Sequence, residues 1–205
     1  MAIKFIYFDL GNVLLDFTHQ RGFAQIAAVS GLSTAQVRTA LVDSGLCDQY
    51  ETGQLSTDEF HARFCEASGA TATVAELARA WGDIFEIKPQ TVALVANLLS
   101  TGHRIGILSN TCAAHWEYAV GRFRSLSLFF DPVIASYQAK VMKPDAGIYQ
   151  IAAKAVGLAP EEIFFADDRD DNVEGARKLG WQAVRFSSAL QLANELESRG
   201  VSFNR

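Results

Sequence analysis

Short apolar segments recur along the chain and predict the buried strands of a parallel sheet. The five segments are residues 3–10, 104–109, 133–136, 163–166 and 183–186. A strand that is covered on both faces reads as a continuous apolar run rather than an alternating one. Helical patterns separate the later segments, over residues 89–100, 145–156, 172–179 and 188–199. This alternation of strands and helices is typical of an α/β fold with right-handed crossovers.

Residues 16–86, between the first two predicted strands, have a different pattern. Helical signals dominate here, and no convincing strand is present. The Ser/Thr-x-x-Glu/Gln spacing of a capping box marks helix starts, and it occurs at Ser33, Ser56 and Thr73. We therefore predict a Rossmann-like core made of residues 1–15 and 87–205, and an all-helical cap over residues 16–86. A cap inserted after the first strand would hang over the carboxyl ends of the strands and act as a lid.

The composition is that of an ordinary soluble globular protein. The chain has 205 residues, of which 49% are hydrophobic and 20% charged, enough for one good core with a modest insertion. The net charge is -5, unlike the basic faces of proteins that bind nucleic acids or anionic membranes. We therefore expect neither of these partners. A small anionic substrate is compatible with this charge, because a bound cation and one lysine reverse the local field.

The cysteines and the N-terminal segment bear on the compartment. The three cysteines, Cys47, Cys65 and Cys112, are odd in number and lack the spacing of a metal site, which favours a reducing compartment. The chain leads directly into a predicted strand without a basic region and cleavage site. It also lacks an apolar stretch long enough to span a bilayer. These features predict a cytoplasmic protein, and they leave open whether it is a monomer or a homodimer.

Polar residues follow four of the predicted strands at the point where each strand ends. In chain order they are Asp9, Ser109 with Asn110, Lys143, and Asp167 with Asp168. Because the carboxyl ends of parallel strands meet at one edge of a sheet, where α/β proteins bind their ligands, these side chains should converge.

This ordered set resembles the four motifs of the haloacid dehalogenase superfamily of hydrolases. The resemblance extends over about residues 5–186, and the insertion lies where that family carries its type 1 helical cap. Residues 53–60 resemble the branch that contains glucose-1-phosphatase-like enzymes and the N-terminal phosphatase domain of epoxide hydrolases. The resemblance implies a Mg²⁺-dependent phosphomonoester hydrolase that acts on a small phosphorylated metabolite, with a sugar phosphate as one candidate.

The resemblance also implies which residues react and which hold the metal. Asp9 would attack phosphorus and form an aspartyl-phosphate intermediate, which divides one difficult displacement into two easier steps. Mg²⁺ prefers hard oxygen ligands. These would be Asp9, Asp168 and the carbonyl of Gly11, with Asp167 acting directly or through water.

The remaining candidates bind the substrate. Ser109 and Asn110 can donate hydrogen bonds to phosphoryl oxygens, and Lys143 adds a positive point charge. We count Ser109 and Lys143 as catalytic together with the nucleophile. Arg21 is a candidate for binding a second substrate anion, and His115 for facing the substrate. A surface ion pair would equally explain Arg21, and packing at a helix start would explain His115.

Position 11 departs from the pattern of most phosphatases in this superfamily. They carry a second aspartate two residues after the nucleophile, which protonates the leaving oxygen, whereas Gly11 cannot transfer a proton. General acid–base help is worth roughly 10²–10⁴ in rate. The superfamily's dehalogenases also lack this aspartate, so a metal-independent 2-haloacid dehalogenase is the alternative hypothesis, and a non-catalytic binding protein with the same fold is a third. The adjacent carboxylates of Asp167 and Asp168 favour the phosphatase.

Overall fold

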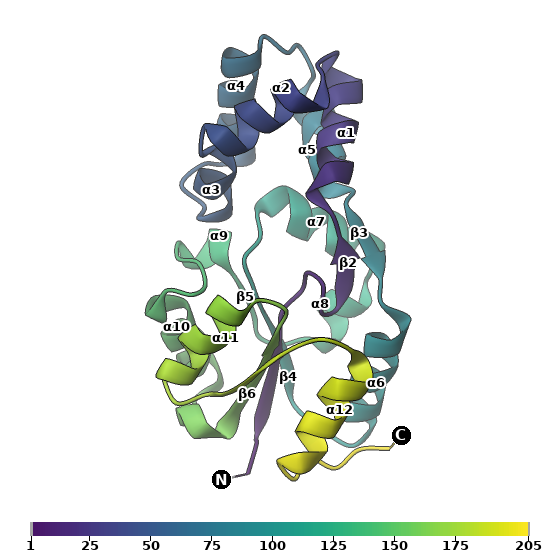
Figure 1. Ribbon diagram of the computed structural model, residues 1–205, viewed down its shortest axis with the longest axis vertical. Coiled ribbons are helices and arrows are strands. Elements are labelled where there is room, and N and C mark those ends of the chain that lie inside the picture. The colour runs from purple at the N-terminus through teal and green to yellow at the C-terminus, as the bar shows by residue number, and fades with distance from the viewer. Residues whose placement is uncertain (1, 205) are drawn as a thin grey trace.

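The computed structural model describes residues 2–204 and has a five-stranded parallel sheet at its centre (Figure 1). The strands lie in the order β5-β4-β1-β6-β7, so the first strand of the chain occupies the middle of the sheet. Their bounds are β1 Phe5–Phe8, β4 Ile105–Ser109, β5 Val133–Ala135, β6 Ile163–Asp167 and β7 Gln182–Arg185. The five predicted strand segments and the α/β fold class are thereby confirmed.

The central strand β1 is buried on both faces. Phe5 and Tyr7 belong to the apolar cluster on one face of the sheet, while Ile6 and Phe8 belong to the cluster on the other. Side chains of successive strand residues point to opposite faces, and none of these four is more than 1% exposed. Double-sided burial explains why this strand reads as a continuous apolar run.

Helices cover both faces of the sheet. The face with Ile6 and Phe8 packs against α6 (Pro89–Ser100), α7 (Ala113–Arg122), α8 (Ser125–Phe129) and α12 (Ala189–Ser198). The second packs against α10 (Ala146–Val156) and α11 (Asp170–Lys178), while α9 (Ser136–Ala139) and the 3₁₀ turn η2 (Pro160–Glu162) are short connections. The four predicted helices are found, and their ends differ by no more than about two residues, the usual uncertainty of a helix end. Within residues 2–204 no helix combines the length and apolar character needed to cross a bilayer.

Between β1 and β4 the chain forms a separate group of helices, which we call the cap, at the top of Figure 1. Its elements are α1 (His19–Ser30), α2 (Thr34–Arg38), the π-helical turn η1 (Thr39–Asp43), α3 (Leu46–Glu51), α4 (Thr57–Ser68) and α5 (Val74–Gly82). The three expected capping boxes form, with Ser33, Ser56 and Thr73 as the N-cap residues of α2, α4 and α5. The cap lies beyond the carboxyl ends of the sheet strands (Figure 1).

Two short strands at the base of the cap differ from the sequence-based expectation. β2 (Leu15–Phe17) and β3 (Phe85–Ile87) pair antiparallel, although no strand was expected within residues 16–86. Each has three residues, too few to show a period-two pattern, and its partner lies at the other end of the insertion. The boundaries expected after residues 15 and 86 therefore cut through a two-stranded connection between cap and core.

The cap contacts the core on two sides. On one side α5 packs on α7, and Trp81 shares an apolar cluster with Cys112 and Ala114 of the core. On the other side Gly53 lies against α9 with φ of +64°, and a Cβ at this position would lie 2.0 Å from the carbonyl oxygen of Tyr137. The close backbone contact at Gly53 leaves no room for any side chain.

We predict that Gly53→Ala destabilises the protein more than Gly69→Ala. Both glycines have left-handed backbone, with φ of +64° and +72°, but a Cβ at Gly69 meets nothing within 4 Å. Left-handed alanine costs about 1–2 kcal/mol, and overpacking adds about 1–3 kcal/mol at Gly53 alone. Urea unfolding of both variants measures the difference. Equal losses would mean that the contact between Gly53 and α9 is loose in solution.

Candidate active site

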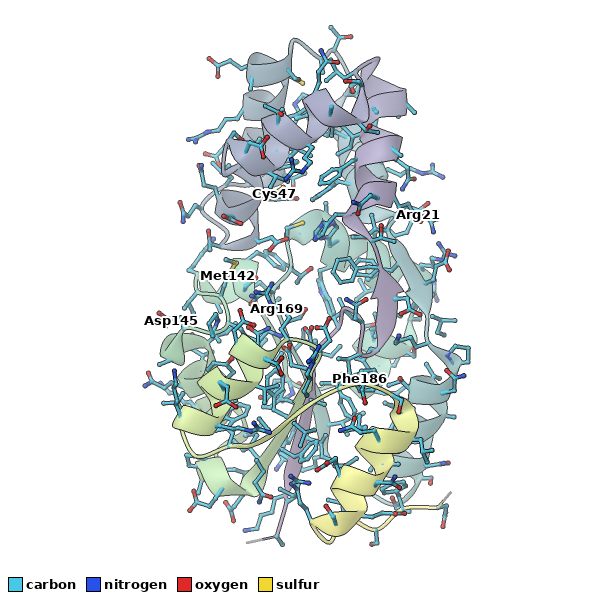
Figure 2. All side chains as sticks on the ribbon, viewed as in Figure 1. Arg21, Cys47, Met142, Asp145, Arg169 and Phe186 are labelled. Carbon is cyan, nitrogen blue, oxygen red and sulfur yellow. The ribbon has the colours of Figure 1, made fainter. Side chains whose placement is uncertain are left out.

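A cavity of about 590 Å³ lies between the carboxyl edge of the sheet and the cap. Figure 2 shows Met142 and Arg169, two of its lining residues, at the level between these two parts. The strand ends and the loops that follow them contribute Asp9, Leu10, Gly11, Asn12, Ser109, Asn110, Thr111, Met142, Lys143, Asp168, Arg169 and Asn172. The rest of the lining comes from the cap, from α7 and from β2 and β3 with the residues beside them, and we call β2 and β3 the hinge strands. These parts contribute Phe17, His19, Asp48, Glu51, Ile84, Phe85 and His115. Polar strand ends therefore face a mixed wall of acids and aromatic rings.

Lys143 links the ends of three neighbouring strands. Its Nζ donates to Asp9 Oδ1 at 2.9 Å, to the carbonyl oxygen of Leu108 at 2.8 Å and to Asp167 Oδ2 at 2.6 Å. The parallel register of β4, β1 and β6 brings these three acceptors to one level of the sheet. An ammonium group has three N–H bonds, and all three are used. Lys143 thus holds the Asp9 carboxylate in one orientation.

Burial and charge together control protonation in this cluster. Asp9 is 8% exposed and Lys143 4%. Burial raises the pKa of Asp9 to about 7, and the neighbouring Lys143 opposes this effect. Burial by itself lowers the pKa of Lys143, but the two carboxylates Asp9 and Asp167 outweigh it and raise that pKa above its usual value. The lysine therefore stays charged and favours the ionised form of Asp9.

Asp167 has hydrogen-bond donors on both carboxylate oxygens. Besides Lys143, the backbone N–H of Arg169 donates to Oδ1 at 2.9 Å, and Asn172 Nδ2 lies 3.0 and 3.1 Å from the two oxygens. The residue is fully buried and does not line the cavity. These contacts are those of a group that anchors the lysine.

Asp168 faces the cavity and is the more accessible of the two adjacent carboxylates. Asn12 Nδ2 donates to its Oδ2 at 2.9 Å. Carboxylate oxygens of Asp9, Asp167 and Asp168 lie within 4.8 Å of one another. Three carboxylates against one ammonium leave an excess of negative charge, which a divalent cation would balance. Hard oxygen donors in this number fit Mg²⁺.

The two polar residues at the end of β4, Ser109 and Asn110, have different environments. The Ser109 hydroxyl is buried and has only a long contact of 3.4 Å, to the carbonyl oxygen of Asn110. The Asn110 side chain instead binds the backbone of Lys143: its Nδ2 donates to the carbonyl oxygen at 2.9 Å, and its Oδ1 accepts from the N–H at 2.8 Å. The Asn110 amide, expected to donate to a phosphoryl group, thus positions Lys143.

The space beside Gly11 is filled by an aromatic ring. A Cβ at this position would lie 2.4 Å from Cε1 of Phe17. Phe17 belongs to β2, and its ring packs edge-on against His19 and contacts Phe85. The hinge strands thus occupy the place where the second aspartate of the related phosphatases would extend.

His115 lies in the cavity wall with an unpaired ring nitrogen. It is 4% exposed, and its Nε2 is buried without a hydrogen-bond partner. Its ring packs against Trp81, Phe85 and His19. Burial, with a smaller contribution from His19, lowers the pKa of His115 to about 3, so the ring is neutral. His115 thus lines the cavity and also packs among aromatic rings near the start of α7, and its contact with a substrate stays a prediction.

Arg21 does not line the cavity. Its guanidinium donates to Glu86 at 2.9 Å and to Asp83 at 3.2 Å. Figure 2 shows it on the opposite side of the view from Met142. These ion pairs match the surface pairing considered for Arg21, and its contact with a second substrate anion stays a prediction.

Sequence analysis missed several cavity residues, namely Asn12, Asp48, Glu51 and Arg169. Asn12 had a usable signal: it follows Gly11 directly, and asparagine tolerates the left-handed backbone that it adopts here, with φ of +56°. Asp48 and Glu51 gave no such signal in the sequence, because charged residues on a short amphipathic helix are typical of a solvated surface.

Comparison with known proteins agrees with this geometry. A family model described as haloacid dehalogenase-like hydrolase matches residues 3–180. The chain is also similar to the D-ribitol-5-phosphate phosphatase of Bacteroides thetaiotaomicron, with 28% identity over 201 residues, which are 95% of this chain and 97% of that protein.

Solved structures with the same fold include two bacterial hydrolases. A HAD-like family hydrolase from Porphyromonas gingivalis superposes with a TM-score of 0.83 at 28% identity, covering 96% of this chain and 98% of the other. A HAD family enzyme from Bacteroides thetaiotaomicron, in complex with magnesium and inorganic phosphate, has a TM-score of 0.80 at 24% identity and covers 91% and 95% of the two chains.

We predict that Gly11→Asp destabilises the protein and does not increase its activity. The new side chain would overlap Phe17, and overpacking of this kind costs about 1–3 kcal/mol. Gly121→Asp is the control, since a Cβ there meets nothing within 4 Å. Adding Phe17→Ala to Gly11→Asp should recover part of the lost stability. A Gly11→Asp variant with the thermal stability of the parent would contradict this interpretation of the Phe17 ring.

We also predict that His115 makes stability fall below neutral pH. The unfolded chain binds a proton at this histidine near pH 6.5, whereas the folded protein does so only near pH 3. Between these values the unfolded state holds more protons, so acid favours unfolding, by about 2 kcal/mol at pH 5.

Urea unfolding at pH 7 and pH 5 measures this effect. His115→Gln should lose about 2 kcal/mol less than the parent between the two pH values. His103→Gln, at a half-buried histidine whose ring contacts the carbonyl oxygen of Ser202, should retain the larger loss of the parent. An unchanged loss in His115→Gln would show that the ring is hydrated in solution.

Proposed function

The chain belongs to the haloacid dehalogenase-like hydrolase family, and we propose that it is a Mg²⁺-dependent phosphatase of small phosphorylated metabolites with Asp9 as its nucleophile. The observation that carries this proposal is the cluster of three carboxylates around one lysine. Asp9 is oriented by Lys143 and open to the cavity, while Asp168 faces the same space. A reacting carboxylate and a phosphate are both anions, so they approach only where positive charge offsets their repulsion.

Asp9, Asp168 and the carbonyl of Gly11 are the groups that would hold the metal ion. Of the two roles expected for Asp167, the one through water is favoured over direct binding, since both of its oxygens already accept hydrogen bonds. When bound, Mg²⁺ would neutralise charge on the phosphoryl oxygens. The phosphatase from Bacteroides thetaiotaomicron and the magnesium- and phosphate-bound structure support this assignment by similarity.

In the proposed first step, the free oxygen of Asp9 forms a bond to phosphorus. The bond from phosphorus to the leaving oxygen breaks, and its electron pair stays on that oxygen, which then takes up a proton. In the second step a water oxygen bonds to phosphorus and its proton passes to solvent, while the bond from phosphorus to Asp9 breaks with its electron pair on the carboxylate and inorganic phosphate leaves. Lys143 favours the ionised form of Asp9 before the first step and orients the Asp9 side chain, and Asn110 holds the backbone of Lys143.

Two further groups support the transfer. Among residues 2–204 the contact found for the Ser109 hydroxyl is the long one of 3.4 Å, so this hydroxyl can donate to a phosphoryl oxygen. The cap would close the cavity and exclude bulk water during the transfer, with β2 and β3 as its connection to the core.

A 2-haloacid dehalogenase is the alternative, and the missing side chain at Gly11 favours it. Halide leaves without a proton, and so such an enzyme needs no second aspartate. However, its substrate carboxylate would meet Asp168 and the acidic cap wall of Asp48 and Glu51. Like charges without a counterion repel, which favours the metal-dependent phosphatase.

We predict that Asp9→Asn removes Mg²⁺-dependent hydrolysis of phenyl phosphate. Loss of the nucleophile should lower kcat by at least about 10³-fold, and chelation of Mg²⁺ should have the same effect on the parent. Asp170→Asn is the control, because Asp170 is exposed and pairs with Arg185 outside the cavity.

Two outcomes would contradict this proposal. Release of chloride from 2-chloropropionate without metal, together with no phosphatase activity, would identify a dehalogenase. Absence of both activities in a folded parent protein would identify a binding protein.

A further inference from the structure

Three buried polar atoms without a hydrogen-bond partner lie around the cavity. In the part of the chain that the structure describes, these are Thr111 Oγ1, His115 Nε2 and Asn172 Oδ1, and each belongs to a cavity-lining residue. An unpaired buried polar group costs about 1–3 kcal/mol, so such atoms in a cavity wall indicate a polar ligand. Asn172 lies beside Asp167, at the phosphoryl end. Thr111 and His115 belong to the loop and helix that contact the cap.

Glu51 approaches the same region from the cap. It is the last residue of α3, and its backbone carbonyl accepts a 2.7 Å hydrogen bond from Ser136 Oγ. The same hydroxyl accepts from the backbone N–H of Thr111 at 2.9 Å. Ser136 therefore joins the end of α3 to the loop after β4. This junction fixes Glu51 beside Thr111, with its side chain in the cavity wall.

The charges of this wall disfavour a second anion on the substrate. Glu51 and Asp48 both line it. Among the described residues around the cavity, the lysine and arginine side chains are Lys143 and Arg169, and both are engaged. Lys143 uses all three N–H bonds within the strand-end cluster, and Arg169 binds Asp171 through two nitrogens, at 3.1 and 2.7 Å. A carboxylate or second phosphate would meet these two acids, while Lys143 has no N–H bond left and the exposed Arg169 is already paired with Asp171.

Neutral hydroxyl groups on the substrate match this wall better than a second anionic group does. The neutral His115 ring offers an unpaired nitrogen, and Thr111 offers a hydroxyl that both donates and accepts. Burial raises the pKa of Glu51 to about 7, with Asp48 adding to the shift and Arg169 opposing it. Near neutral pH the Glu51 side chain therefore exists in two forms. The carboxylate accepts hydrogen bonds, and the protonated carboxyl also donates one. The rings of Phe17 and Phe85 add apolar surface, against which the C–H groups of a polyhydroxylated substrate can pack.

We propose that Glu51, Thr111 and His115 form a hydroxyl-binding subsite, which selects a polyhydroxylated leaving group that carries no second anionic group. The inference rests on the proposed phosphatase function, because it assumes that the phosphoryl group lies at Asp9. The leaving group then extends from the strand ends toward the cap, and the cap contributes to substrate choice through Glu51.

The test compares three monophosphates with the Mg²⁺-loaded parent and Glu51→Gln: a pentitol phosphate, 3-phosphoglycerate and phenyl phosphate. In the parent, kcat/KM should be highest for the pentitol phosphate and lowest for 3-phosphoglycerate. Glu51→Gln should lower kcat/KM for the pentitol phosphate about tenfold more than for phenyl phosphate, the scale of one lost hydrogen bond to a charged group. The same substitution should also raise kcat/KM for 3-phosphoglycerate relative to kcat/KM for phenyl phosphate. Glu66→Gln, at an exposed glutamate of α4, is the matched control and should keep the parent's ratios.

Binding gives a second readout that does not depend on turnover. In an Asp9→Asn background, calorimetry should show weaker binding of the pentitol phosphate when Glu51→Gln is added, by about tenfold in Kd. If Glu51→Gln lowered kcat/KM equally for the pentitol phosphate and phenyl phosphate, the proposed subsite would be overturned. A preference for phosphoethanolamine that Glu51→Gln abolishes would also overturn it, in favour of a cationic leaving group. No hydrolysis of any phosphate by the folded parent would instead refute the proposed function.

Discussion

The buried ion pair between Lys143 and Asp9, shared with Asp167, is the interaction on which the rest of the site depends. Removing two charges from water is costly, and their attraction repays this only when the remaining donors and acceptors are also satisfied. Here the carbonyl oxygen of Leu108 takes the third N–H bond of the lysine, and Asn172 satisfies Asp167. The register of three parallel strands provides these partners, so the sheet itself determines how Asp9 is oriented.

This arrangement separates two tasks along one cavity. The strand ends concentrate charge, with three carboxylates and a lysine, and suit an anionic group together with a metal ion. The opposite wall comes from the cap, the hinge strands and α7, and combines acids with aromatic rings and the unpaired Nε2 of His115. Ser136 connects the two, since its hydroxyl bonds to Glu51 on the cap and Thr111 on the core. Any movement of the cap would therefore change the wall opposite the strand ends.

Local patterns were sufficient for much of the fold. The helix expected over residues 89–100 has these bounds in the structure, because a proline fits the first turn and the apolar spacing is regular. The capping boxes formed because they depend on residues three apart. The hinge strands β2 and β3 were missed, since each is short and is stabilised by a partner far away in the sequence. The bonds of the Asn110 amide to the backbone of Lys143 were missed too, because the two residues are far apart in the sequence.

The sequence by itself determined the parallel sheet, the inserted helices and the meeting of Asp9, Ser109, Lys143 and Asp168 at one edge. These features follow from burial on both strand faces and from the common direction of parallel strands, which are properties of continuous segments. Only the tertiary structure decided what surrounds these residues: that Phe17 fills the space beside Gly11, that Arg21 pairs with Asp83 and Glu86, and that Glu51 reaches the cavity. Each of these depends on how the inserted segment folds and packs, and no local spacing encodes that packing.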